Sequence, residues 1–347
     1  MPAKPVVAVV ILNWNGRKFL ESFLPGVIEF SSSEAKIVVA DNASTDDSVE
    51  YLTSHFPQVE IIRNNQNYGF TTGYNKALAQ VDADYYLLLN SDIEVTAGWL
   101  TPLIALMESD QKIAACQPVI RAYNQKEYFE YAGAAGGYID RYGYPFCRGR
   151  IFSSLEKDNG QYQTTTEVFW ATGACMMVRA SLYRSMGGLD DDFFAHMEEI
   201  DFCWRLKNAG YKIFVCHESV VFHVGGGTLP KNNPRKTFLN FRNNLYLLVK
   251  NSPDSRLAGI LMMRRVFDLI AMLKFALEGH FADARTIPAA YREFRKNKDR
   301  MRLKRGVIPD TPPGQIYWGK IVLRHYILRA KKFSKLNPER FTRSSVK

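Results

Sequence analysis

Polar, turn-forming residues follow four successive apolar runs in the first third of the chain. Each set contains Asn or Asp side chains, which can fix a turn or bind a ligand. One such set would be an ordinary turn, but four in succession favour a ligand site assembled from several loops. The sets are Asn13-Trp14-Asn15-Gly16, Asp41-Asn42-Ala43-Ser44-Thr45-Asp46, Asn64-Asn65-Gln66-Asn67-Tyr68-Gly69-Phe70 and Asn90-Ser91-Asp92.

Two carboxylates in these sets suggest different chemistry. Asp41 ends the second apolar run, where it could accept hydrogen bonds from a base or a ribose. Asp92 could hold a divalent cation, because Mg²⁺ and Mn²⁺ bind one or two carboxylates and complete their shells with phosphates and water. The sequence lacks both the GxGxxG motif of dinucleotide sites and the GxxxxGK[ST] motif of P-loops. A nucleoside diphosphate bound with Mg²⁺ or Mn²⁺ fits these residues.

Five short apolar runs alternate with segments of helical periodicity, which predicts an α/β fold whose mostly parallel sheet has helices on both faces. Ligands of such sheets bind beyond the carboxyl ends of the strands, and all four polar sets lie at these ends. We expect strands at 6–13, 36–40, 59–63, 85–89 and 113–119, and helices near 18–30, 46–55, 72–80 and 98–108.

The four polar sets resemble, in residues and in order, the motifs of the family 2 glycosyltransferases, and most closely those of the rhamnosyltransferase-like bacterial branch. The resemblance continues through 171–179, 187–194 and 198–205 and ends at His223, so that it spans about residues 6–228. Each motif is weak alone, whereas their succession is specific. The resemblance implies a GT-A fold, with a Rossmann-like mixed sheet flanked by helices, that binds a nucleotide-sugar and transfers the sugar with inversion.

The resemblance also assigns residues to the donor and the metal. It implies that Asp41 contacts the base and that Asp92 is the last position of an Asp-x-Asp metal motif, whose first position is Asn90 here. His223, beside the glycines at 225–227, would reach the metal or the diphosphate, so Asp92 and His223 are the expected ligands of Mg²⁺ or Mn²⁺. The expected nucleotide-sugar-binding residues are Asn13, Asn15, Asp41, Asn67, Gly69, Gly73, Asn75, Asn90, Ser91 and Asp92.

Three carboxylates stand at the start of an expected helix that ends near residue 209. An inverting transferase needs one carboxylate to take the proton of the acceptor hydroxyl, and the helix dipole favours ionised acids in a first turn. The resemblance implies that Glu199 is this base, with Glu198 and Asp201 as further candidates, although an acidic first turn is also common in any fold. Trp170, Gly173, Trp204 and Arg205 are the expected acceptor-binding residues, although a core strand is an equal alternative for 169–173; the acceptor pocket is expected in the weakly patterned stretch 121–166.

The formal net charge of +10 is divided unevenly along the chain. Residues 231–347 contain 27 Lys and Arg against 8 Asp and Glu, which leaves 18 against 27 in residues 1–230. We therefore expect a catalytic, nucleotide-sugar-binding domain over 1–230 and a basic, mostly helical region over 231–347, with helices at 240–250, 256–278 and 284–305. An anionic membrane surface is the expected partner of the basic region. Nucleic acid is the competing partner, but no recognised binding motif accompanies the basic residues, so none is expected.

The expected helix 256–278 divides into a polar half and an apolar half. The apolar half requires cover from the catalytic domain, a second chain or lipid. The polar half contains Arg264, Arg265, Asp268, Lys274 and Glu278, and the apolar half contains Met262, Met263, Val266, Leu269, Ile270, Leu273 and Leu277.

Five cysteines without a CxxC pair indicate reduced thiols and an intracellular protein. No segment has the roughly 18 uncharged apolar residues of a membrane span. We therefore expect a cytoplasmic, inverting, metal-dependent glycosyltransferase, peripheral on the inner face of the cell membrane, that acts on a glycan or lipid-linked acceptor in cell-surface polysaccharide synthesis, with rhamnose as the candidate sugar. The alternatives are a non-catalytic nucleotide-sugar-binding protein and a basic nucleic-acid-binding protein.

Overall fold

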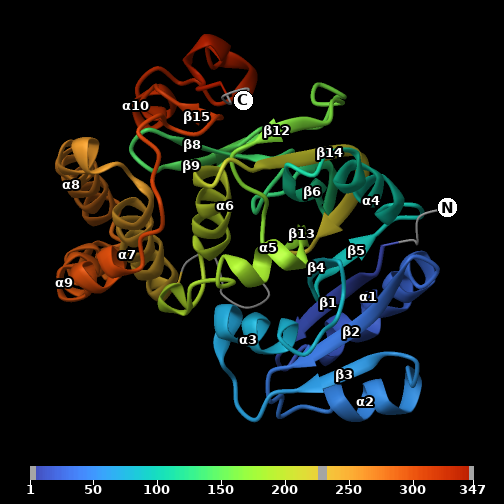
Figure 1. Ribbon diagram of the computed structural model, residues 1–347. Helices are drawn as coiled ribbons and strands as arrows, with labels where there is room; N and C mark the ends of the chain where they lie inside the picture. The colour runs from blue at the N-terminus through green and yellow to red at the C-terminus, as the bar shows by residue number, and fades with distance from the viewer. Residues whose placement is uncertain (1–4, 226–232, 344–347) are drawn as a thin grey trace.

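A ten-stranded mixed sheet runs through the centre of the computed structural model, which describes residues 5–225 and 233–343 (Figure 1). Its strands are β1 (Val7–Asn13), β2 (Ala35–Asp41), β3 (Glu60–Arg63), β4 (Tyr85–Asn90), β5 (Ile93–Val95), β6 (Ile113–Ala122), β7 (Gln125–Phe129), β12 (Thr166–Val168), β13 (Cys175–Arg179) and β14 (Lys212–His223). The order is β12-β14-β6-β13-β4-β1-β2-β3, with β5 beside β14 and β7 beside β6. The four strands β3, β2, β1 and β4 are parallel neighbours, whereas β13 is antiparallel to β4 and β6. The four polar sets therefore follow four adjacent strands at one edge.

Helices cover both faces of this sheet, as the continuous apolar strands predict. Along β1, Ala8 and Val10 join one buried cluster and Val7, Val9 and Ile11 join the other. Side chains of α1, α2 and α4 fill the second cluster, and those of α3, α5 and α6 fill the first. The helices are α1 (Arg17–Ser31), α2 (Ser48–His55), α3 (Gly69–Leu78), α4 (Leu100–Ser109), α5 (Ala180–Ser185) and α6 (Glu198–Asn208), with a 3₁₀ turn η1 (Asp191–Phe193).

The predicted strands and helices of the first third are confirmed, with end shifts of a few residues. A second sheet was not predicted. Four of its strands lie in the weakly patterned stretch 121–166, and the fifth comes from the C-terminal region. Its strands are β8 (Gly137–Asp140), β9 (Pro145–Cys147), β10 (Arg150–Ile151), β11 (Ser154–Leu155) and β15 (Ile316–Tyr317), in the order β11-β10-β9-β8-β15. Strands of two to four residues are too short to show a periodicity, which is why the sequence does not reveal them.

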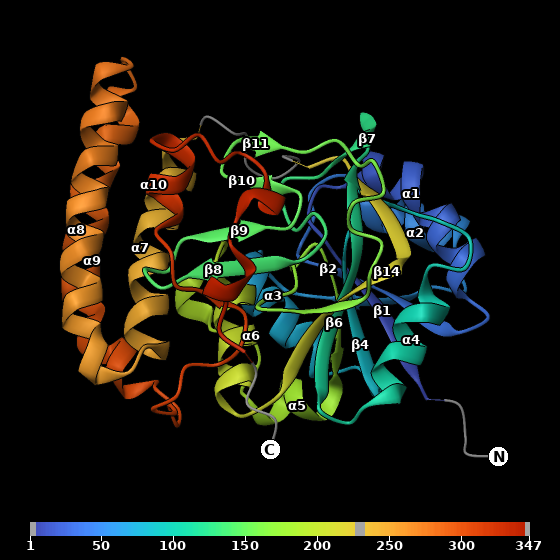
Figure 2. The same cartoon turned by 90° about the horizontal axis from the view of Figure 1, so that it is seen from above.

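The C-terminal region forms helices beside α6, as predicted (Figure 2). α7 packs against α6, and α8 and α9 lie on the outer side of α7 in both views. The boundary expected between residues 230 and 231, and the glycines 226 and 227, lie outside the described residues. Strand β15 nevertheless pairs with β8, so the C-terminal region shares a sheet with the catalytic part. Its elements are α7 (Pro234–Asn251), α8 (Asp254–Leu277), α9 (Phe281–Leu303), α10 (Ile321–Tyr326) and the 3₁₀ turns η2 (Phe333–Lys335) and η3 (Pro338–Arg340).

The side of helix α8 that packs against the rest of the protein contains polar residues. The sequence analysis instead expected the apolar half of this helix to need cover. Arg264 and Asp268 are buried and ion-paired at 3.1 Å, with the guanidinium over the Tyr144 ring at 3.8 Å. The hydroxyls of Tyr144 and Tyr291 donate to the Asp268 carboxylate at 3.1 and 2.8 Å, which satisfies it inside the fold. Most of the predicted apolar half is left uncovered by the described chain. We call this surface the α8 apolar face: Met262, Val266, Leu269, Ile270, Leu273 and Leu277.

All five cysteines are buried and free of disulfide bonds, as their spacing predicts. None of the helices in the described ranges combines the length and the apolar composition that crossing a bilayer requires.

Candidate active site

The loops after β1 and β2 are joined by hydrogen bonds into one unit. Asn13 and Asp41 are register partners at the strand ends, and Nδ2 of Asn13 donates to Oδ1 of Asp41 at 3.1 Å and to Oγ of Ser44 at 3.2 Å. The other carboxylate oxygen of Asp41 accepts the Ser44 amide at 2.9 Å. Asn15, in the left-handed region at φ 50°, accepts the Thr45 amide at 2.7 Å. Oδ1 of Asn13 is buried and has no donor among the described residues, so it can accept a hydrogen bond from a ligand.

Asn42 organises the loop after β3. It belongs to the second polar set but was not among the expected binding residues. Its Nδ2 donates to Oδ1 of Asn67 at 2.9 Å and to the Gly69 carbonyl at 3.0 Å. Its Oδ1 accepts Nδ2 of Asn64 at 3.1 Å and the Tyr68 amide at 3.2 Å. One buried amide side chain therefore fixes the third polar set against the second.

Two predicted glycines allow close contacts, and one predicted asparagine lies elsewhere. Gly69 has φ +72°, and a Cβ there would lie 2.7 Å from the Phe194 ring; a Cβ on Gly73 would lie 3.1 Å from Nδ2 of Asn42. Asn75 instead donates to the Leu189 carbonyl at 2.7 Å. Asn75 therefore ties α3 to the loop before α6, and the structure does not bring it to the strand-end loops.

Asp92 and His223 meet at the end of β4, and Glu130 completes the cluster. Oδ1 of Asp92 lies 3.1 Å from Nε2 of His223, and Oδ2 accepts the Gly225 amide at 3.2 Å. Nδ1 of His223 lies 3.3 Å from Oε2 of Glu130. Nδ2 of Asn90 lies 3.5 Å from Nε2 of His223. The two expected metal ligands, Asp92 and His223, thus lie side by side, whereas nothing in the sequence indicated Glu130.

The electrostatics of this cluster keep His223 charged and Asp92 ionised. Burial alone would lower the pKa of His223, but the hydrogen bonds and charges of Asp92 and Glu130 raise it to about 10. Burial alone would raise the pKa of Asp92, but the hydrogen bond and charge of His223 lower it. Both Asp92 and His223 are at least nine-tenths buried. Their facing atoms therefore share one proton.

Ser91 adjoins the loop after β1. A Cβ on Gly16 would lie 2.3 Å from Oδ1 of Asn13 and 3.6 Å from Oγ of Ser91. The absence of a side chain at Gly16 therefore lets the loops after β1 and β4 meet. The predicted residues Asn13, Asn15, Asp41, Asn67, Gly69, Gly73, Asn90, Ser91 and Asp92 form a continuous set of loops at this edge.

Glu198 and Glu199 begin α6 with carboxylate oxygens that have no hydrogen-bond partner among the described residues. Burial raises the pKa of Glu199 to about 7, and burial followed by repulsion from Glu199 raises the pKa of Glu198 well above its ordinary value. Gly173 lies beside Glu199, because a Cβ on Gly173 would be 3.6 Å from Cβ of Glu199 and 3.3 Å from the Phe70 ring. A buried carboxylate with a raised pKa and a free oxygen can act as a general base near neutral pH.

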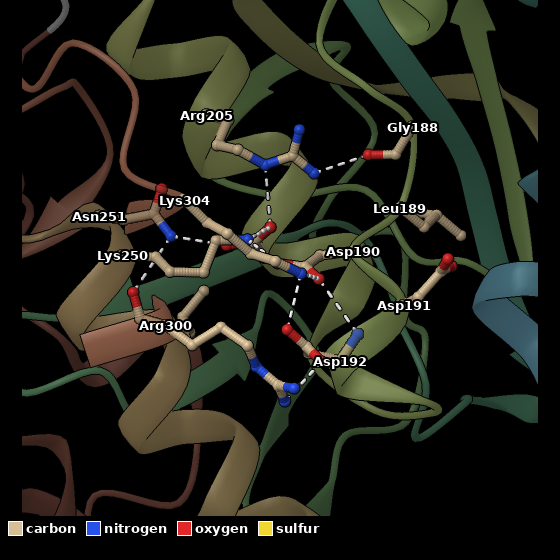
Figure 3. Close-up of polar contacts among 12 residues, drawn as sticks. Gly188, Leu189, Asp190, Asp191, Asp192, Arg205, Lys250, Asn251, Arg300 and Lys304 are labelled. Atoms are coloured by element: carbon tan, nitrogen blue, oxygen red, sulfur yellow. Dashed lines mark hydrogen bonds and ion pairs between the residues drawn. The ribbon is translucent and has the colours of Figure 1, made fainter. Parts of the chain in front are cut away.

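Asp201, the third candidate base, is fully buried in an ion-pair network that ties α6 to α7 (Figure 3). Its Oδ2 lies 2.9 Å from Nε of Arg205 and 2.8 Å from Nζ of Lys250, and its Oδ1 accepts Nδ2 of Asn251 at 2.8 Å. Burial alone would raise the pKa of Asp201, but Lys250 and Arg205 lower it. Both oxygens are occupied, so the expectation that Asp201 could be the base is wrong: its charge stabilises the helix pair.

Two of the four expected acceptor residues have structural contacts, and a third lines a cavity. Trp170 is buried, and its Nε1 donates to the Tyr138 carbonyl at 2.9 Å, as the core-strand alternative predicts. Arg205 donates to the carbonyls of Met186 and Gly188 at 2.6 and 2.7 Å. Trp204 lines a separate cavity of about 370 Å³ between α6, the start of α8 and residues 308–318. Only Gly173 lies beside Glu199.

The loop that leads into α6 is held in a strained conformation by α7. Phe194, His196 and Met197 have φ values of 65°, 71° and 73°, which non-glycine residues adopt at a cost. Nδ2 of Asn243, a buried residue of α7, lies 2.9, 2.8 and 2.7 Å from the carbonyl oxygens of Phe193, Ala195 and His196. The position of Glu198 and Glu199 therefore depends on α7.

Basic residues of the C-terminal region also hold the acidic residues of this loop (Figure 3). Lys250 and Lys304 each lie 2.5 Å from Asp190. Lys304 and Arg300 lie 2.6 and 2.7 Å from Asp192. Burial alone would raise the pKa of Asp190, but Lys250 and Lys304 lower it to about 2. Nothing in the sequence indicates these contacts, because the partners lie 60 or more positions apart.

The architecture matches solved structures of glycosyltransferases. GalNAc-T7 with UDP, GalNAc and Mn²⁺ superposes with a TM-score of 0.59 at 17% identity, over 73% of this chain and 49% of that one. The mannosyltransferase PcManGT from Pyrobaculum calidifontis, in complex with GDP-Man and Mn²⁺, superposes with a TM-score of 0.51 at 14% identity, over 86% of this chain and 76% of that one. The fold is thus the GT-A fold of these glycosyltransferases.

The sequence comparisons specify the family. The model of Glycosyl transferase family 2 matches residues 8–187, more than half of the chain. The chain therefore belongs to glycosyltransferase family 2. It is 24% identical over 238 residues to an N-acetylglucosaminyl-diphospho-decaprenol L-rhamnosyltransferase of Mycobacterium tuberculosis, over 64% of this chain and 78% of the relative. The predicted family, its rhamnosyltransferase relatives and the GT-A fold are confirmed.

Proposed function

We propose that this glycosyltransferase moves a sugar, with rhamnose as the candidate, from a nucleoside-diphosphate sugar to a lipid-linked glycan acceptor and inverts the anomeric configuration. The name of the mycobacterial relative, a rhamnosyltransferase for a sugar-diphospho-lipid, supports this acceptor class and a role in cell-surface polysaccharide synthesis. The observation that carries the proposal is the pair of carboxylates at the start of α6, Glu198 and Glu199, each with a buried oxygen that has no hydrogen-bond partner among the described residues, and with Cβ of Glu199 beside Gly173.

The donor would bind at the edge formed by the strand-end loops. Asp41 is 3% exposed and fixed by Asn13 and Ser44, so its carboxylate is preorganised to accept a hydrogen bond from a base or ribose. The free Oδ1 of Asn13 offers a second acceptor beside it. The diphosphate would then extend toward Asp92 at the end of the adjacent strand β4.

The chemistry of Asp92 and His223 fits a divalent cation. Their facing oxygen and nitrogen lie 3.1 Å apart and are both metal-ligating types, so the cation would take the place of the proton that Nε2 of His223 carries in its absence. Glu130 stands behind the other ring nitrogen, an arrangement that commonly orients a ligating histidine. Within the described ranges, no three His, Cys, Asp or Glu side chains form a metal site by themselves, so the donor phosphates would complete the shell. The cation would stabilise the negative charge of the departing diphosphate.

The base would be Glu199, with Glu198 as its competitor. The acceptor hydroxyl gives its proton to the carboxylate while its oxygen forms a bond to the anomeric carbon and the bond from that carbon to the diphosphate breaks. The close approach of Glu199 to Gly173, an expected acceptor-binding residue, favours Glu199. The raised pKa of Glu199 matches a base that must hold this proton at the end of the step.

Conservative substitutions test this assignment. Glu199→Gln should abolish transfer to an acceptor and keep the thermal stabilisation by nucleoside diphosphate with Mn²⁺, whereas Glu198→Gln should keep measurable transfer. Glu29→Gln, at an exposed position of α1, is the matched control and should behave as the wild type. Wild-type turnover of Glu199→Gln would refute its role. Loss of transfer in Glu198→Gln alone would move the role to Glu198.

The α8 apolar face supports attachment to an anionic membrane surface from the cytoplasmic side. Its side chains are about half to nine-tenths exposed, from Val266 at 49% to Leu277 at 89%. Arg265 and Lys274 on the same helix are exposed, and Lys331 and Lys332 follow the exposed apolar pair Ile327–Leu328 beyond α10. An apolar stripe flanked by cations is the composition of helices that lie in the interface of an anionic bilayer.

Flotation with anionic vesicles tests this attachment. The double variant Leu269→Ser/Leu273→Ser should lose co-flotation with vesicles of phosphatidylcholine and phosphatidylglycerol. Val6→Ser, which removes an equally exposed apolar side chain directly before β1, should not. Equal recovery of both variants would contradict the proposal. A wild-type dimer in light scattering that the double variant abolishes, without any flotation, would assign the face to a second copy of the chain.

A further inference from the structure

The cavity beside Trp204 lies on a different face of α6 from Glu199. Its volume is about 370 Å³, and its walls come from α6, the end of α7, the start of α8 and residues 308–318. Successive residues of an α-helix turn by about 100° and rise by about 1.5 Å, so Trp204 and Asn208 point about 140° and 180° away from Glu199 and lie roughly 8 and 14 Å further along the axis. The cavity is therefore separate from the proposed catalytic carboxylates, with the helix between them.

Four polar side-chain atoms of the cavity wall are buried without a hydrogen-bond partner in the described chain. They are Nε1 of Trp204, Oγ of Ser252, Oδ1 of Asn208 and Nε of Arg141. Trp204 and Ser252 are only 5% and 1% exposed. An unpaired buried polar group is unfavourable, and a buried indole N–H usually has an acceptor. The wall therefore offers two N–H donors, one amide oxygen and one hydroxyl to a ligand.

The rest of the lining is mainly apolar. Ile260 and Met263 of α8 and Ile316 of β15 contribute to it, together with prolines of the segment 308–313. Asp140 is the only carboxylate among the described lining residues, and both its oxygens are occupied by backbone amides at 2.9–3.1 Å. A volume of this size, with apolar walls and a few convergent polar groups at the junction of two parts of a chain, is typical of small-molecule sites.

The mixture of these groups selects the chemistry of the ligand. A hydrocarbon chain would leave the four polar atoms unpaired. A fully hydroxylated hexose would press an additional hydroxyl against the apolar wall. A 6-deoxyhexose satisfies both conditions, because its ring hydroxyls donate and accept hydrogen bonds while its methyl group is apolar.

We propose that the cavity behind α6 binds a 6-deoxyhexose unit of a glycan. The N–H groups of Trp204 and Arg141 donate to its hydroxyls, Oδ1 of Asn208 accepts from one, and the methyl group lies against the apolar wall formed by α8 and β15. This site goes beyond the transfer proposed at Glu199. It rests on that function only for the source of the sugar, which is an earlier unit of the same glycan.

The five tryptophans of the chain make the site observable. In protein labelled with 5-fluorotryptophan, methyl α-L-rhamnoside should shift the fluorine NMR resonances of Trp204 and Trp318, which line the cavity. The resonance of Trp99, whose Nε1 donates to Ser31 at 3.1 Å, should stay in place. Methyl α-L-mannoside differs only by the hydroxyl on its sixth carbon, and we expect it to require an about 10- to 100-fold higher concentration.

A variant that fills the cavity supplies the second measurement. Gly259 of α8 lines the cavity, and a Cβ there would meet no other described part of the chain within 4 Å. Gly259→Leu therefore adds bulk without a clash at Cβ, and leucine favours a helix more than glycine does. Gly26→Leu is the matched control, because Gly26 also lies in a helix and has the same free space. We expect Gly259→Leu to lose the response to the rhamnoside and Gly26→Leu to keep it.

The outcomes separate the site, its ligand and the proposed function. An equal response of Gly259→Leu and the wild type would overturn the cavity as the binding site. A preference for the mannoside, or a response of Trp204 to octyl phosphate but to neither glycoside, would overturn the 6-deoxyhexose. The absence of any response in a protein that transfers sugar would overturn this inference and leave the proposed function intact. Binding by a protein without transferase activity would refute the proposed function and leave the cavity site intact.

Discussion

Asn243 links the C-terminal helices to Glu198 and Glu199, the proposed catalytic carboxylates, and its removal should lower activity more than stability. Its side-chain amide holds the carbonyls of Phe193, Ala195 and His196 in the loop that enters α6. We consider Asn243→Ala, which removes these hydrogen bonds without adding bulk. The matched control is Asn240→Ala on the same helix, because no hydrogen bond of the Asn240 side chain is found in the described chain.

The magnitude follows from the carbonyls that lose their donor. The Phe193 carbonyl keeps Nη2 of Arg242 at 3.1 Å, whereas those of Ala195 and His196 lose the only side-chain donor within the described structure. Two buried acceptors left unpaired cost about 1–3 kcal/mol each, and water entering the space of the lost amide keeps the total near 2–4 kcal/mol. For a chain of this size, with an unfolding entropy of about 2.1 cal/mol/K per residue, that corresponds to a melting temperature lower by roughly 3–5 °C.

The activity should suffer more, because the released loop is strained. Left-handed backbone at Phe194, His196 and Met197 costs about 1–2 kcal/mol per residue, so the loop relaxes once its anchor is gone. A displacement of about 1 Å at a catalytic group can cost about 100-fold in rate, and we expect kcat to fall about 10- to 100-fold. Phe194 of the same loop packs beside Gly69 of the expected donor-binding set, so the donor KM should change as well, but by less than kcat.

Steady-state kinetics at a temperature well below both melting points, with melting curves of each variant, measures the two effects separately. Wild-type kcat in Asn243→Ala, or a loss of kcat equal to that of Asn240→Ala, would refute the idea that α7 positions Glu199. A loss confined to the donor KM would show that the loop acts on donor binding instead.

Three further predictions concern the metal, the base and α8. In Asp92→Asn, the extra thermal stabilisation that Mn²⁺ adds to nucleoside diphosphate should disappear in scanning fluorimetry, and an unchanged increment would exclude Asp92 as a ligand. The base must be ionised and burial raises the pKa of Glu199 to about 7, so kcat should rise with pH through that value; a rate already constant from pH 5 upward would contradict a buried base. Arg264→Met should destabilise the fold by about 3–5 kcal/mol in urea unfolding because Asp268 stays buried without its guanidinium, and Arg264→Met/Asp268→Asn should recover part of that loss.

The sequence predicts the strands and the strand-end loops well, because both are local. A continuous apolar run such as β1 has only one stable environment, a sheet covered on both faces, and the residue after it must then lie at the sheet edge. Asp41 and Asp92 follow from this rule, and the pairing of Asp92 with His223 followed from the family resemblance. None of these predictions requires knowledge of a distant contact.

The remaining features depend on partners far along the chain. Glu130 follows a short strand in an unpatterned stretch, and only the fold brings it to His223. In the sequence, Asp201 is one of three equivalent acids. Only its ion pair with Lys250, 49 positions away, distinguishes it from the other two. Trp204 and Arg205 follow the catalytic carboxylates in sequence, but the helix turns them toward a cavity and toward carbonyls. Proximity to Glu199 therefore depends on the helix face that a residue occupies relative to α7. Position along the helix predicts it less well.

The uneven charge of the chain has two structural consequences, one inside the fold and one on its surface. Lys250, Lys304 and Arg300 are occupied by Asp190, Asp192 and Asp201, so part of the basic surplus binds the acidic loop of the catalytic part.

These internal pairs make α7 necessary for the fold of the site. Without Lys250, Asp201 would lose one of its two cationic partners and its charge would be partly uncompensated inside the protein, which is unfavourable in a low dielectric. The cations that do remain on the surface, such as Lys274 and Lys331, lie instead beside the exposed apolar residues of α8 and α10. We therefore infer that the basic region both completes the catalytic scaffold and carries the surface that would meet the acceptor's lipid, which explains why one segment of the chain holds both.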